Sequence, residues 1–173
     1  MEALERYLNS FGKSVVNKAK GILKKKKKVV SGDLLNSIKF RITKNKDKLS
    51  VEFLMADYGT FVDKGVSGTQ QKRTYVDYKG QRLNTPYSYG KSRDGGLTRG
   101  LDKWIVRRGI APRDEQGRFI SRKSLKFLIA RKIYTKGIEG ISFFQKPLQL
   151  ELRGFYDKVG KAVKQDIENI ITV

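Results

Sequence analysis

The chain has 173 residues, of which 38 are lysine or arginine and 17 are aspartate or glutamate, so its formal net charge is +21. It contains no histidine and no cysteine, which excludes imidazole bases, thiolate nucleophiles, disulfides and the commonest ligands of zinc, copper and iron. A small domain with this much positive charge repels itself unless a polyanion neutralises it. The composition therefore predicts a negatively charged partner.

The length predicts a single domain over residues 1–173. Hydrophobic residues make up only 38% of the chain, so the core is expected to be thin for a self-sufficient monomer. No apolar run approaches the length that crosses a bilayer, and no signal-peptide pattern follows the first charges, so we expect no membrane partner. The net charge is +8 in residues 1–66, +12 in residues 67–140 and +1 in residues 141–173, which predicts one basic face and one face suited to protein contact.

The first segment predicts an amphipathic helix from residue 2 to about residue 24. Apolar residues recur there at steps of three and four, at Leu4, Leu8, Phe11, Val15, Ala19 and Ile22. A run of five lysines follows, made of Lys24, Lys25, Lys26, Lys27 and Lys28. Two interpretations of this run stay open: a solvated helix end, where cations are favoured, or a loop that faces DNA phosphates.

Residues 31–38 predict a short helical turn that leads into a strand. Alternating apolar residues at 39–43 and 49–55, joined by a polar connection, predict an antiparallel β-hairpin. Its apolar side is expected to carry Phe40, Ile42, Val51, Phe53 and Met55. Residues 58–65 end this half of the chain, with Gly65 and Gly68 as breakers.

Residues 67–100 are rich in Gly, Ser and Gln. We expect them to be poorly ordered in the free subunit, apart from a short strand near residues 75–78, and to become ordered against a partner. Four tyrosines interleaved with basic residues either stack on bases or supply a partner-docking surface, and we favour docking. They are Tyr75, Tyr78, Tyr87 and Tyr89.

Two further helices are predicted, one from about residue 97 to Gly109 and one that Ser121 caps. The connection between them is too long for a helix-turn-helix motif, which argues against specific DNA reading. With the lysine run, four arginines are the candidate DNA-facing residues: Arg107, Arg108, Arg122 and Arg131.

The C-terminal stretch predicts a long helix that begins near Pro147 and carries an apolar stripe from Leu148 to Ile170. The stripe is expected to pack on the sheet, on the first helix or on a neighbouring subunit. Phe143 and Phe144, just before this helix, are expected to anchor it against the hairpin. The fold class expected is therefore α+β: an N-terminal helix, a small antiparallel sheet, a long C-terminal helix packed on it, and a loop-rich and helical insertion.

Enzymatic functions find little support in the sequence. Acidic residues are few and are not spaced to hold a divalent cation, and no Gly-rich phosphate-binding loop is present. We therefore expect no catalytic residue, no metal and no cofactor.

Three short motifs, taken in order, resemble those of the tail-completion, or neck, proteins of tailed bacteriophages. That family has a Thr-Gly-x-Leu-x-x-Ser-Ile element after its first helix, matched here with Ser for Thr by Ser31, Gly32, Leu34, Ser37 and Ile38. An aromatic segment leading to Val-Glu-x-Gly is matched, with Asp for Glu, by Tyr58, Phe61, Val62, Asp63 and Gly65. An aromatic-x-x-Pro-Ala/Leu entry to the last helix is matched by Phe144, Pro147 and Leu148.

The resemblance covers residues 1–66 and 137–173, and residues 67–136 would be an insertion. It implies a structural virion protein that forms a six- or twelvefold ring in the head–tail connector, in contact with portal or adaptor and tail proteins, around the genomic DNA. The alternative from another class is a free, non-specific nucleic-acid-binding protein of nucleoid or ribosome-associated type. That alternative shares the charge but does not predict the three motifs.

Overall fold

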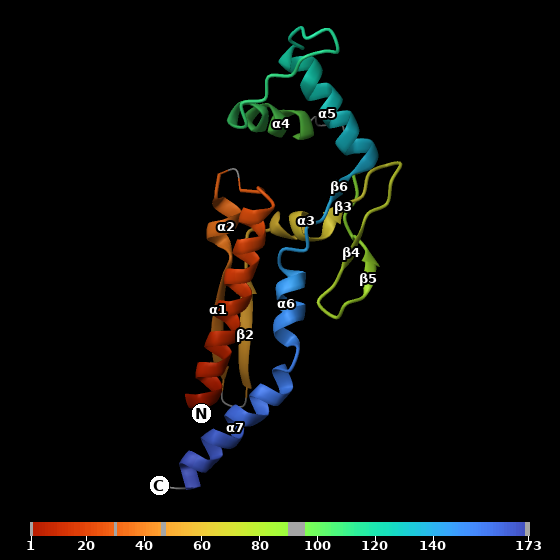
Figure 1. Ribbon diagram of the computed structural model, residues 1–173. Helices are drawn as coiled ribbons and strands as arrows, with labels where there is room; N and C mark the ends of the chain where they lie inside the picture. Colours follow the sequence, from red (N-terminus) through yellow and green to blue (C-terminus); the bar gives the residue numbers. More distant parts are fainter. Residues whose placement is uncertain (1, 30, 46–47, 90–95, 172–173) are drawn as a thin grey trace.

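The computed structural model describes residues 2–29, 31–45, 48–89 and 96–171, with only the backbone of residues 96–99. It shows an elongated α+β protein in which a helical arm projects from one end of a helix-and-hairpin body (Figure 1). The predicted class, the N-terminal helix, the β-hairpin and the C-terminal helical region are all confirmed.

Helix α1 (Glu2–Lys25) and the hairpin of β1 (Lys39–Asn45) and β2 (Lys48–Leu54) form the body. The strands pair in antiparallel register, with Phe40 opposite Phe53. At Gly12 of α1 a Cβ atom would lie 2.3 Å from Cδ2 of Phe40, so glycine lets the ring lie directly on the helix. The core contains one face of α1 together with residues from the first and third motifs and the neighbouring Phe143: Phe11, Val15, Val16, Ala19, Leu23, Leu34, Ile38, Phe143 and Phe144.

A buried carboxylate connects the body to the C-terminal region. Asp63 lies in α3 (Gly59–Lys64), is 2% exposed, and accepts a hydrogen bond of 2.8 Å from the backbone amide of Phe144. This amide directly precedes α6 (Gln145–Leu152), where the first turn of a helix has amides without helical partners. The Asp63 carbonyl also accepts from the amide of Ser142 at 3.0 Å.

The first motif packs on the same junction. Ser37, at the end of α2 (Asp33–Ser37), accepts a hydrogen bond from the Ala56 amide at 2.9 Å and donates one to the Leu34 carbonyl at 2.8 Å. A Cβ atom on Gly59 would lie 2.8 Å from the Leu34 side chain, so α2 contacts the first turn of α3 closely. All three motifs therefore meet at one place in the fold.

The expectation of a single long C-terminal helix is wrong at Gly154. This glycine has a φ of +70°, which a right-handed helix does not allow, and the chain turns there from α6 into α7 (Phe155–Ile171). Helix α7 then packs along α1, with the Phe155 ring 4.9 Å from that of Phe11. The C-terminal region contacts the hairpin through Phe144, which precedes α6 in the chain. The centroid of its ring lies 5.3 Å from that of Phe53. Of the hairpin residues expected on the apolar side, Phe40, Phe53 and Met55 pack on the core, whereas Ile42 and Val51 lie farther along the hairpin.

A second buried carboxylate fixes α7 to the start of α1. Asp166 accepts hydrogen bonds from the amides of Ala3 at 2.8 Å and Leu4 at 3.0 Å. Burial disfavours its charged form, but these two amides outweigh that effect and lower the pKa of Asp166 below its ordinary value. The negative charge also lies at the positive end of the α1 dipole.

The insertion is joined to the body by two short paired strands, which we call the stem. Strand β3 (Gly65–Val66) pairs there with β6 (Ile138–Glu139). At Gly65, φ is +79° and a Cβ atom would lie 2.6 Å from the amide nitrogen of Gly140; at Gly137, φ is +71° and a Cβ atom would lie 2.1 Å from the Val66 carbonyl. Gly65 is therefore required by close backbone packing, and not only as a breaker.

The expectation of poor order in residues 67–100 is wrong for residues 67–89. They form a hairpin of β4 (Thr74–Val76) and β5 (Arg82–Asn84), and the amides of Thr69 and Gln70 donate to carbonyls of the last turn of α5. Residues 90–95 lie outside the described residues. The two predicted helices are confirmed as α4 (Gly96–Arg107) and α5 (Arg122–Lys136), and Ser121 caps α5 through the Ser124 amide.

The buried aromatic pair allows a direct stability test. Phe143 is fully buried, so Phe143→Ala should lower the free energy of unfolding by about 3–5 kcal/mol because it removes a packed ring and leaves a cavity. The matched control is Phe127→Ala in α5, where the ring is 61% exposed and the change should stay within about 0.5 kcal/mol. Urea unfolding of both variants measures the difference, and equal values would contradict the assigned core.

Asp63 allows a test that depends on pH. Burial raises the pKa of Asp63 above its ordinary value of 3.8, although hydrogen bonds from the Phe144 and Gln145 amides lower it. The folded protein therefore holds this proton more tightly than the unfolded chain, and the carboxyl's contribution to stability declines as pH rises through the folded pKa. Asp63→Asn keeps an acceptor but cannot ionise, so its stability relative to wild type should increase as pH rises from about 4 to 7.

Asp63→Ala is the companion variant. It leaves the buried Phe144 amide without an acceptor, which should cost about 1–3 kcal/mol at any pH. Urea unfolding at several pH values distinguishes the two effects. A constant difference between wild type and Asp63→Asn would show that Asp63 does not titrate in this range.

Candidate nucleic-acid interface

The five-lysine run forms the end of α1 and the turn after it. The Lys28 amide donates to the Leu23 carbonyl at 3.1 Å and the Lys27 amide to the Lys24 carbonyl at 3.0 Å, while Lys27 has a φ of +52°. This is the hydrogen-bond pattern of a Schellman motif, with lysine in the left-handed position that glycine usually occupies. All five side chains are exposed. The helix-end interpretation is thus correct for the backbone, and the ammonium groups remain available to a ligand.

One predicted arginine lies at the same helix end. The guanidinium of Arg108, just after α4, donates a hydrogen bond of 2.6 Å to the Lys27 carbonyl. A cation is favoured at the C-terminal end of a helix, where carbonyls lack partners. Arg108 therefore connects the arm to the body through one guanidinium nitrogen, and its contact with DNA phosphates stays a prediction.

The other three arginines are spread over the arm. Arg122 lies 4.0 Å from the Asp102 carboxylate, an acid that Lys126 also approaches at 3.5 Å. Arg107 and Arg131 are exposed, and no ion pair is found for either among the described residues. The structure thus brings only Arg108 to the lysine run; the predicted basic residues do not form one cluster.

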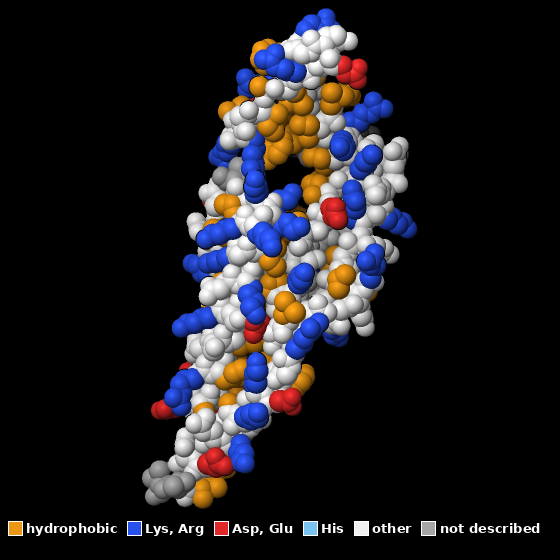
Figure 2. All heavy atoms as spheres, in the orientation of Figure 1, with side chains coloured by type: hydrophobic (Ala, Val, Ile, Leu, Met, Phe, Trp, Pro, Cys, Tyr) orange, Lys and Arg blue, Asp and Glu red, His pale blue; other side chains and the backbone are white. Residues whose placement is uncertain are grey.

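Two lysines from the run instead meet a residue from the opposite end of the chain. Lys25 and Lys26 line a groove of about 720 Å³ together with Lys146 of α6. A second hollow of about 230 Å³ beside it is lined by Lys18, Lys25 and Lys146. No acidic residue lines either hollow. Figure 2 shows the same arrangement on a larger scale, with many blue and few red side chains on both sides of an apolar seam over α1 and α6.

Sequence reasoning missed Lys18 and Lys146. Lys146 is far from the run in sequence, and only the packing of α6 on α1 brings it there. Lys18 is partly neutralised, since it forms an ion pair with Glu151, which Ser14 also hydrogen-bonds at 2.6 Å. Burial raises the pKa of Glu151, but the contacts with Lys18 and Ser14 outweigh it and lower that pKa. Lys25, Lys26 and Lys146 are therefore the cations best placed for an external anion.

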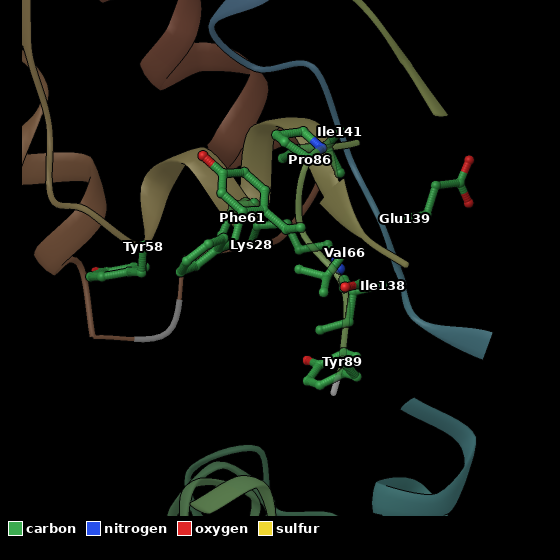
Figure 3. Close-up of a pocket in the computed structure, with 12 residues that line it drawn as sticks. Lys28, Tyr58, Phe61, Val66, Pro86, Tyr89, Ile138, Glu139 and Ile141 are labelled. Carbon is green, nitrogen blue, oxygen red and sulfur yellow. The ribbon is translucent and has the colours of Figure 1, made fainter. Parts of the chain in front are cut away.

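The four tyrosines divide into two pairs. Tyr75 lies under the Lys64 ammonium group, 5.4 Å from it, and the Tyr78 amide donates to Gln145 of α6 at 2.9 Å. Tyr87 and Tyr89 instead line an apolar groove of about 710 Å³ between α3 and the stem. Figure 3 shows Tyr58 and Phe61 on one side of this groove and Val66, Ile138 and Tyr89 on the other. The proposed docking surface thus consists of Tyr87 and Tyr89.

Two tyrosines of the groove, Tyr58 and Tyr89, have raised pKa values. Burial raises the pKa of Tyr89, and burial together with the Asp33 carboxylate raises that of Tyr58. The Phe61 and Tyr87 rings meet edge to face with centroids 4.5 Å apart, a favoured aromatic geometry. The groove therefore presents apolar and aromatic surface together with tyrosine hydroxyl groups.

Within the described ranges, no group of three acidic residues could hold a metal ion. Nor does any helix in the part of the chain that the structure describes have the length and apolar character needed to span a membrane. Comparison with protein-family models, with curated proteins and with solved structures finds no match.

The lysine groove can be tested by its salt dependence. The triple variant Lys25→Gln, Lys26→Gln, Lys146→Gln should weaken binding to duplex DNA of any sequence. It should also reduce the slope of log K against log salt by about 0.9 for each phosphate that the protein no longer neutralises. The matched control removes the same charge from exposed lysines elsewhere, Lys13, Lys44 and Lys48. An equal effect of both triple variants would show that only net charge matters.

Proposed function

We propose that the protein is a structural subunit of the head–tail connector, or neck, of a tailed bacteriophage virion. Copies of the chain form a ring, six- or twelvefold, between the portal or adaptor and the tail, and the ring lines or seals the conduit for genomic DNA. The observation that carries this proposal is the junction around Asp63. The three motif segments that resemble neck proteins pack on one another there, so the resemblance concerns one connected structural unit.

The distribution of charge supports a DNA-lined position. Among the described residues, the hollows between α1 and α6 are lined by several lysines and by no acid, which suits contact with phosphates. DNA that moves through a conduit requires contacts that do not depend on sequence. The same charge would let a free protein coat nucleic acid, and this remains the alternative.

The arm supports contact with other proteins of the particle. Helices α4 and α5 pack on each other and project from the body (Figure 1). The two helices and the connection between them carry several large apolar side chains that are more than half exposed, Val106, Phe119, Phe127 and Leu128. An exposed apolar patch of this kind commonly marks a protein interface. We expect the portal, adaptor or tail protein to bind here.

The proposal predicts a closed ring. Sedimentation and mass photometry of the purified protein should show one assembly of six or twelve copies. Negative-stain images should show a central channel, and the protein should be found at the neck of particles by labelling. The DNA-coating alternative predicts monomers that bind along duplex DNA at a fixed spacing and are absent from particles. That second result would overturn the neck assignment.

A further inference from the structure

The C-terminal half of α7 presents an apolar face that the rest of the described chain does not cover. Ile167, Ile170 and Ile171 are 51%, 70% and 77% exposed. They are spaced at i, i+3 and i+4, so they lie near one another on the helix. Ala162 and Asp166 are buried toward α1, and Ile170, four residues after Asp166, lies beside this buried side but is itself exposed. Figure 1 shows this end of α7 extending beyond the hairpin. Helices that lie in a partner's groove use anchors with this spacing.

The same chain has an apolar groove without an occupant from the described residues. It is the hollow of about 710 Å³ whose lining is mostly aromatic or aliphatic, from Tyr58, Phe61, Val62, Val66, Pro86, Tyr87, Tyr89, Ile138 and Ile141. Among the described residues that line it, Lys28 is the basic one. The other charged lining residue, Glu139, points its carboxylate away from the apolar side chains (Figure 3). The groove therefore offers apolar walls and a positive charge.

We propose that the C-terminal half of α7 from one copy binds in this groove on the next copy. The choice of a second copy follows from charge. In a chain of net charge +21, residues 141–173 carry only +1, so this segment approaches another copy with the least repulsion. The C-terminal end of a helix carries partial negative charge, which suits Lys28 in the groove.

The contact is heterologous, because helix and groove are different surfaces. Every copy has one of each, so a linear chain of copies leaves a groove and a helix uncovered at its ends, and only a closed ring covers all of them. The inference thus deepens the proposed ring by naming its subunit contact. The contact itself depends on the two apolar surfaces and not on DNA or on the virion.

The experiment uses two variants of the full chain. The helix variant is Ile170→Asp with Ile171→Asp, and the groove variant is Phe61→Glu with Ile138→Glu, at side chains that are 43% and 37% exposed. Phe61→Leu is the conservative control for the groove and should assemble as wild type. Circular dichroism confirms that each variant is folded. Each of the two charged variants alone should be monomeric, with the Kd of self-association raised about thirtyfold or more, as expected when an interface hot spot is removed.

The mixture of the two variants is the decisive measurement. The groove variant still has an intact helix and the helix variant still has an intact groove, so one contact can form and no second one can follow. Mass photometry of an equal mixture should show a dimer and nothing larger. Charge reversal tests the role of Lys28, since Lys28→Glu should weaken assembly.

The possible failures are distinguishable. Folded variants that assemble as wild type, a mixture that stays monomeric, or a small apolar molecule retained in the groove by native mass spectrometry would overturn the helix–groove contact. A wild-type protein that remains monomeric at all accessible concentrations would also overturn it. A mixture that forms the dimer, from a protein that is absent from particles, would support the contact and overturn only the neck assignment.

Discussion

The carboxylate of Asp63 lies where three distant parts of the chain must meet. It is buried, it caps the start of α6 through the Phe144 amide, and its own helix carries the stem on which the insertion is mounted. A buried carboxylate is costly without partners, and here backbone amides provide them. If this junction failed, the body would lose α6, the aromatic pair would lose its position, and the basic hollow beside Lys146 would no longer exist.

A similar device closes the other end of the body. Asp166 binds the first amides of α1 from the last helix, so each of two helix starts is fixed by a carboxylate from elsewhere in the chain. Apolar burial then completes the packing between these points, along Phe11, Phe53, Phe144 and Phe155. In a chain with a thin core, these hydrogen bonds fix where the helices lie relative to one another. Hydrogen bonds are directional, so they set helix positions that a few apolar contacts alone would not set.

The hollows that gather lysines and the groove that gathers aromatic side chains lie in different places in this protein. Lysines line the hollows between α1 and α6, while the largest exposed apolar side chains lie on α7, on the arm and in the groove beside α3. A strongly basic protein can associate with copies of itself only where charge is low or compensated. This separation is consistent with a subunit that has both a polyanion and protein neighbours.

The sequence by itself determined the local structure. The periodicity of α1, the alternation of the hairpin and the Ser121 cap each depend on neighbours a few residues away, so helix and strand positions could be predicted well. It did not determine whether the helix continues through Gly154 or ends there. A glycine within an apolar stripe allows either, because it can adopt both helical and left-handed backbone angles. Tertiary structure alone decided the grouping of Lys25 and Lys26 with Lys146, the pairing of Arg108 with the Lys27 carbonyl, and the groove that Tyr87 and Tyr89 line. These contacts join residues far apart in the chain, and their positions follow from how α6, the stem and the arm pack, which no local pattern encodes.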